Sequence, residues 1–159
     1  MMAKKSNFTL TFDDKEIRRK LAQVETAVRV EATKKGLHAL ALFLIGHIKV
    51  NIVNRKLVDT GNLLGSVQED ELVVFSDGGY VMFGPHTVYA AIHEFGGVIL
   101  PTNGPYLVFK GKDGNWVMTK SVHMPARPYI RPALDEHGKE ALDFMGSTIG
   151  SIIEGSWSK

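Results

Sequence analysis

A helical pattern over residues 15–54 constrains the fold more than any other feature of this sequence. The pattern contains two apolar stripes: Ile17, Leu21, Val24 and Val28, then Leu37, Leu40, Ala41, Leu44, Ile45, Ile48 and Ile52. Val28 and Leu37 are nine positions apart, which at ~100° per residue puts the stripes half a turn out of phase. We therefore expect a long helix that is kinked or broken near Gly36, or one whose two halves face different partners.

The second half of this helix is apolar nearly all round, so we expect it at the centre of the core or of a subunit interface. The longest apolar run, residues 39–46, is far shorter than the roughly 18 residues that a membrane span needs. The first residues contain lysines but no apolar segment of the kind found in signal peptides. We expect no membrane association.

The chain has 159 residues, which is enough for one domain with a core, and we treat 1–159 as a single domain. It has no cysteine, which excludes disulfides, thiolate metal sites and cysteine nucleophiles. Its formal net charge of +2 is too small to indicate nucleic-acid binding as the main activity.

Strand-like segments and turn signals precede and follow the long helix. The predicted strands are residues 7–12, 66–75, 80–84, 98–101, 105–110 and 116–124. Residues 88–97 predict a short helix closed by Gly96. Residues 125–134 are too rich in proline for regular structure, and Pro132 suits the first turn of a last helix. The order predicts an α+β fold, with the long N-terminal helix packed on a small, mostly antiparallel sheet and a helix at the C-terminus.

The triplet Asp59-Thr60-Gly61 follows the long helix and matches the catalytic tripeptide of aspartic proteases. A protease of the retroviral type pairs two such triplets across a dimer and is nearly all strands, whereas here the triplet follows a helix. The favoured interpretation is a structural turn in which Asp59 caps backbone N–H groups, Gly61 adopts an unusual conformation and Leu63 anchors the turn. An aspartic hydrolase that uses Asp59 remains the alternative.

The histidines do not show the spacing of a metal site. The segment His93-Glu94-Phe95 resembles the start of a zinc-protease motif, but the second histidine is replaced by Gly97. His38 and His47 are nine apart on opposite faces of one helix. We expect no catalytic residues, no cofactor and no metal, with a metal-dependent hydrolase as a further alternative.

The stretch "PARPYIRP", residues 125–132, alternates prolines with arginines and a tyrosine. Stiff backbone, arginine and tyrosine suit a protein–protein contact. An arginine that clamps carbonyls or an acid within the domain is an equally weighted interpretation. We expect Arg127 or Arg131 to donate hydrogen bonds that fix this segment.

Three stretches in this order resemble the tail-completion or neck proteins of tailed bacteriophages, a family that includes head–tail joining, virion-morphogenesis and minor tail proteins. The matched residues are Asp59, Thr60, Gly61, Leu63 and Ser66; Tyr89, Ala90, Glu94, Phe95 and Gly96; and residues 125–132. The resemblance runs from the middle of the long helix to the start of the last one.

The resemblance implies a structural virion protein and no enzyme. Such a protein is a subunit of a homo-oligomeric ring, commonly hexameric, that lies in the neck or tail and assembles in the cytoplasm of the host bacterium. Its partners are the portal or connector and the tail-terminator or tail-tube proteins, and DNA passes through the lumen without being read. We expect interaction roles for Glu94, Phe95, Arg127, Tyr129 and Arg131.

Overall fold

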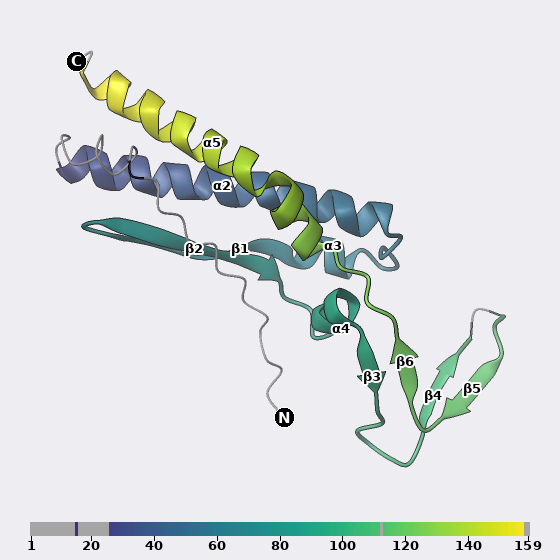
Figure 1. Cartoon of the computed structure of the whole chain (residues 1–159). Helices are drawn as coiled ribbons and strands as arrows, with labels where there is room; N and C mark the ends of the chain where they lie inside the picture. Colours follow the sequence, from purple (N-terminus) through teal and green to yellow (C-terminus); the bar gives the residue numbers. More distant parts are fainter. Residues whose placement is uncertain (1–14, 16–25, 112, 158–159) are drawn as a thin grey trace. The chain divides into compact units, whose positions relative to one another are not determined.

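The structure is a computed structural model that describes residues 15, 26–111 and 113–157 (Figure 1). The chain, which we expected to form a single domain, forms two compact units. The first, which we call the helical unit, comprises Met1–Thr87 and Tyr129–Lys159; the second, the insert unit, is Val88–Pro128. The predicted strand at residues 7–12 and the stripe residues Ile17, Leu21 and Val24 lie outside the described residues.

The helical unit has three layers. Its elements are α2 (Thr26–Asn54), α3 (Asn62–Ser66), β1 (Val67–Phe75), β2 (Gly78–Pro85) and α5 (Ile130–Trp157). Helix α2 is the middle layer, because α5 lies along one side of it and the β1–β2 hairpin along the other (Figure 1). The predicted α+β fold with a long N-terminal helix, small antiparallel sheets and a C-terminal helix is confirmed.

The main apolar core of the helical unit lies between α2 and α5. Its buried members are Ala32, Leu40 and Leu44 from α2 and Ala141, Met145, Ile149 and Ile153 from α5. Val81 and Phe83 of β2 pack against the same cluster. Since α2 supplies contacts to both outer layers, its nearly all-round apolar character follows from its place in the middle.

Of the alternatives expected for this helix, the break at Gly36 is wrong, because α2 is one unbroken helix over Thr26–Asn54. Gly36 is buried and lies against α5. A Cβ atom at this position would lie 2.6 Å from Cγ1 of Ile149 and 3.1 Å from Cγ of Met145. The glycine therefore serves helix–helix packing and does not end the helix.

Within the described residues, α2 is the single helix whose length and composition would allow it to cross a membrane. A helix in the core of a soluble protein can meet the same two criteria. Nine residues of α2 are buried within the protein, among them Leu40, Leu44 and Ile48, which are at most 2% exposed. Burial in the core accounts for part of the apolar composition of α2, whereas Leu42, Val50 and Val53 are each 53% exposed.

The insert unit contains one short helix and two small antiparallel sheets. They are α4 (Ala90–Phe95), β3 (Gly97–Ile99) paired with β6 (Val122–Met124), and β4 (Leu107–Lys110) paired with β5 (Trp116–Thr119). Helix α4 ends as predicted at Gly96, whose φ is 68° and whose N–H donates to the Ile92 carbonyl. The strands are short, so this unit has little core of its own.

Pro132 lies in the first turn of α5, as the sequence predicts, but the helix already begins at Ile130, within the proline-rich stretch for which we expected no regular structure. Pro132 is tolerated because a first-turn residue needs no intrahelical N–H bond. The Asn51 side chain donates to the Tyr129 carbonyl at 3.1 Å, and Tyr129 itself is fully buried. This contact fixes the start of α5 against the last turns of α2.

We predict that Gly36→Ala lowers the free energy of unfolding by ~1–3 kcal/mol, because the added methyl group overpacks the contact with Ile149. Gly46→Ala is the matched control on the same helix. Gly46 is exposed, with nothing within 4 Å of an added Cβ, so this change should stabilise by ~0.5–1 kcal/mol. Urea denaturation measures both variants, and equal effects at the two positions would contradict a tight crossing at Gly36.

Candidate functional site

The first motif forms the connection between α2 and α3. Asp59 is exposed, and the residue at the N-cap of α3 is Gly61, with φ of 82° and no side-chain cap bond. The Thr60 hydroxyl accepts a long hydrogen bond, 3.4 Å, from the Asn62 N–H. Leu63 is buried, at 3% exposed. The prediction that Asp59 caps this helix is therefore wrong, since Gly61 occupies the cap position.

We predict that Gly61→Ala destabilises the protein by ~1–2 kcal/mol, because a non-glycine residue resists the left-handed conformation. Asp59→Ala should change stability by less than about 0.5 kcal/mol, as is usual at an exposed position. Gly65→Ala, in α3 and with open space around an added Cβ, is the control. Thermal unfolding of the three variants ranks their stabilities. If the Asp59 variant is destabilised as much as the Gly61 variant, the hypothesis that Asp59 is a cap is restored.

The second motif forms α4 of the insert unit. Glu94 is 3% exposed, whereas the neighbouring Phe95 is 52% exposed. Of the two residues for which we expected interaction roles, only Phe95 presents a surface to a partner. The Tyr89 ring meets the His93 ring edge-on, with centroids 5.8 Å apart.

The third motif joins the insert unit to α5 along the chain. The Arg127 backbone N–H donates to the His93 carbonyl at 2.7 Å and ties the proline-rich segment to α4. The main chain of Arg127 makes this bond, whereas we had expected the guanidinium of an arginine. Arg127 and Arg131 are exposed, but Tyr129 is fully buried, so its ring is part of the core and not of a contact surface.

His93 lies in a setting that disfavours its charged form. Burial, and in second place the positive charge of Arg127, hold the pKa of His93 below its ordinary value. Its Nδ1 atom is buried and has no hydrogen-bond partner among the described residues. The folded chain therefore holds His93 neutral at pH values at which the unfolded chain protonates it.

We predict that the free energy of unfolding falls as pH drops from about 6.5, the ordinary histidine value, through the lowered pKa of His93. The unfolded state binds the proton first, so acid favours unfolding. His93→Phe should remove this part of the pH dependence, while Arg127→Gln should only weaken it, because burial is the larger cause. Denaturation at several pH values tests this, and an unchanged slope in His93→Phe would contradict it.

The β4–β5 hairpin of the insert unit exposes an apolar surface, which we call the hairpin face. Val108 lies opposite Met118, and Lys110 lies opposite Trp116, so these four side chains share one side of the hairpin. Val108 is 58% exposed, Met118 67% and Trp116 70%. Lys110 Nζ lies 5.6 Å from the centroid of the Trp116 ring, a cation–π distance.

Other large apolar side chains of the insert unit are exposed as well. They are Val88, Tyr89, Phe95, Val98, Ile99, Leu100, Tyr106 and Phe109. Clusters of exposed aromatic and aliphatic side chains mark interaction sites more often than scattered single ones do. The insert unit is therefore the best candidate for a protein-binding surface in the part of the chain that the structure describes.

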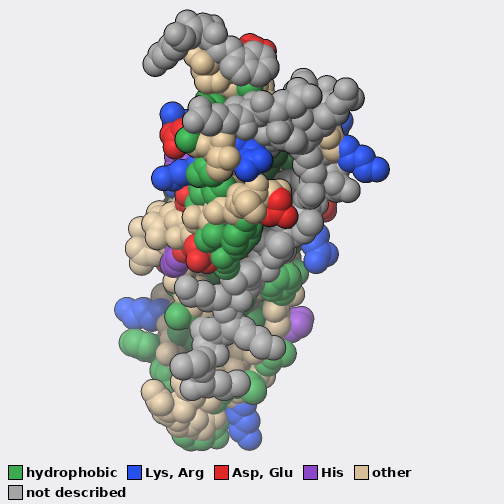
Figure 2. All heavy atoms as spheres, turned by 90° about the vertical axis from the view of Figure 1, so that its left-hand side faces the viewer, with side chains coloured by type: hydrophobic (Ala, Val, Ile, Leu, Met, Phe, Trp, Pro, Cys, Tyr) green, Lys and Arg blue, Asp and Glu red, His purple; other side chains and the backbone are tan. Residues whose placement is uncertain are grey.

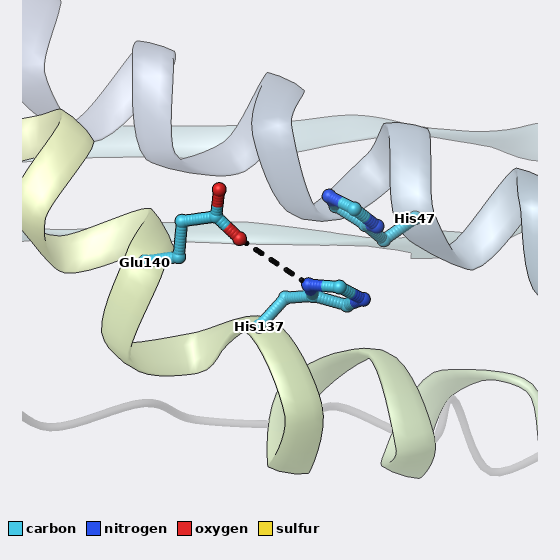
Figure 3. Close-up of side chains that lie close together, drawn as sticks. All are labelled: His47, His137 and Glu140. Atoms are coloured by element: carbon cyan, nitrogen blue, oxygen red, sulfur yellow. Dashed lines mark hydrogen bonds and ion pairs between the residues drawn. The ribbon is translucent and has the colours of Figure 1, made fainter.

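The structure also brings together three possible metal ligands that the sequence analysis did not connect (Figure 3). They are His47 on α2 and His137 and Glu140 on α5, and their ligand atoms all lie within 4.8 Å of one another. The expectation of no metal site rested on ligand spacing along the chain, which left open a site assembled in space. The packing of α2 on α5 brings His47 close to His137 and Glu140. In the sequence, the three-residue spacing of His137 and Glu140 on one helix was the one indication that these two side chains lie together.

Basic and acidic side chains of the described residues are interspersed on the face shown in Figure 2, so this face is neither uniformly positive nor uniformly negative. This agrees with the small formal net charge of +2.

Comparisons with protein-family models, curated proteins and solved structures give no match to this chain. The likeness to phage neck proteins thus rests on the three sequence motifs alone.

Proposed function

We propose that this chain is a structural protein of a tailed-bacteriophage virion, a subunit of a hexameric ring that joins the head connector to the tail. Its neighbours are other copies of itself, the portal or connector, and a tail-terminator or tail-tube protein. DNA passes through the lumen of the ring. The subunit is made and assembled in the host cytoplasm.

The observation that carries the proposal is the exposed apolar surface of the insert unit, together with the order of the three motifs. Trp116, Met118 and Val108 are each more than half exposed on one side of a hairpin. An exposed apolar surface of this kind is typical of a protein–protein contact, and an assembly subunit buries it against a neighbour.

The helical unit supports the proposal in a different way. Its core between α2 and α5 is continuous, and the start of α5 is fixed to α2 by the Asn51–Tyr129 hydrogen bond. A rigid body of this kind keeps the geometry of a ring subunit constant. The turn at Gly61 belongs to that body, and Asp59 has no catalytic role in this proposal.

We predict that the double variant Trp116→Ser and Met118→Thr folds normally but fails to assemble. The helical unit contains neither residue, so its unfolding midpoint should stay within a few degrees of the parent value. Joined head–tail particles, counted by electron microscopy after complementation of the phage that encodes the chain, should fall at least about tenfold, as expected for loss of two interface anchors.

The matched control is Phe75→Ser, which removes an apolar side chain that is 52% exposed on β1 of the helical unit. This control should leave particle numbers unchanged. Normal particle numbers in the hairpin variant would overturn the proposed role of the hairpin face. Peptide cleavage by the parent protein that is lost in Asp59→Asn would support an aspartic hydrolase in its place.

A further inference from the structure

We propose that His47, His137 and Glu140 form a binding site for a divalent transition-metal ion of the zinc type, which bridges α2 and α5. The inference is independent of the role in virion assembly, because it rests on the helical unit alone. Each of the three side chains offers one ligand atom.

The cluster brings the three ligand groups from two helices to one place (Figure 3). The two imidazole rings are stacked, with centroids 3.6 Å apart and planes 20° from parallel. Nδ1 of His137 lies 3.4 Å from Oε2 of Glu140. Zinc–nitrogen and zinc–oxygen bonds of about 2.0–2.2 Å place neighbouring ligand atoms on the order of 3.3 Å apart in a tetrahedral site. Because a bound metal lies in the plane of each imidazole ring, at least one of the two stacked rings must turn before both nitrogens can bind one ion.

The donor set selects the class of ion. Two imidazole nitrogens and one carboxylate oxygen suit zinc and the neighbouring first-row metals, whereas calcium and magnesium prefer oxygen ligands alone. Three protein ligands leave a fourth tetrahedral position, which water fills. Because the Glu140 side chain is 66% exposed, that position is open to solvent.

The surroundings hold the histidines in place. The Phe43 ring lies 4.8 Å from the His47 ring and 5.7 Å from the Phe144 ring, centroid to centroid. These aromatic rings make one wall of the cluster apolar. His137 and Glu140 are three residues apart on α5, so both side chains reach the same side of that helix.

An ion at this position links the two helices whose packing forms the core of the helical unit. A ligand that binds only the folded state stabilises it by mass action. Zinc should therefore raise the unfolding temperature, and a chelator should reverse the rise. The affinity should fall in acid, because imidazole and carboxylate ligands must be deprotonated to bind the ion.

The test is calorimetric titration of zinc chloride into the chelator-treated, dialysed full chain, with thermal unfolding measured in parallel. We expect one ion per chain. The variants His47→Ala, His137→Ala and Glu140→Gln should each lower the affinity by more than the ~10-fold that loss of an outer-shell partner costs. Each should also abolish the zinc-induced rise in unfolding temperature.

Two controls keep the cluster intact. His38→Ala removes another α2 histidine, which pairs with Glu69 at 2.7 Å, and Glu136→Gln removes an exposed carboxylate one turn before Glu140. Both should bind zinc as the parent does. Because Glu140 is exposed, its variant should fold even if a histidine variant does not. No zinc binding by the parent, or equal loss in control and cluster variants, would overturn the site.

Discussion

The close approach of α5 to α2 at Gly36 is the contact on which the rest of the helical unit depends. At this point a side chain as small as a methyl group would overlap Ile149. The approach lets the apolar rows of both helices interlock around Leu40, Leu44 and Met145. It also sets the separation at which His47 can meet His137, so the core packing and the proposed metal site share one cause.

The sequence predicts the fold class well because the spacing of apolar residues along each segment agrees with the contacts that the segment makes in the structure. The second apolar stripe, the hairpin turns and Gly96 after α4 all act through nearby residues, and each appears in the structure. The break at Gly36 was predicted wrongly because a glycine that ends a helix and one that admits a neighbour look the same in sequence. Only the partner, Ile149, distinguishes them, and it lies more than a hundred residues away.

The candidate sites were less predictable for the same reason. The expected interaction residues include Tyr129 and Glu94, which are buried, and Phe95, Arg127 and Arg131, which are exposed; residue type alone does not separate the two groups. The capping role assigned to Asp59 assumed a helix start that the chain places two residues later, at Gly61. His47, His137 and Glu140 carry no shared motif, because two helices bring them together.

The two units differ in how far their large apolar side chains are exposed, and this difference is the main structural argument for the proposed function. The helical unit buries an apolar cluster between α2 and α5, and among its described residues the most exposed large apolar side chains, such as Leu42, Val50 and Val53, are 53% exposed. The insert unit leaves Trp116, Met118 and Leu100 more than 60% exposed. A two-stranded hairpin is marginally stable in water unless it packs against something else. The strands of the insert unit have three or four residues, so under the proposed function a neighbouring subunit that covers the hairpin face would stabilise this unit.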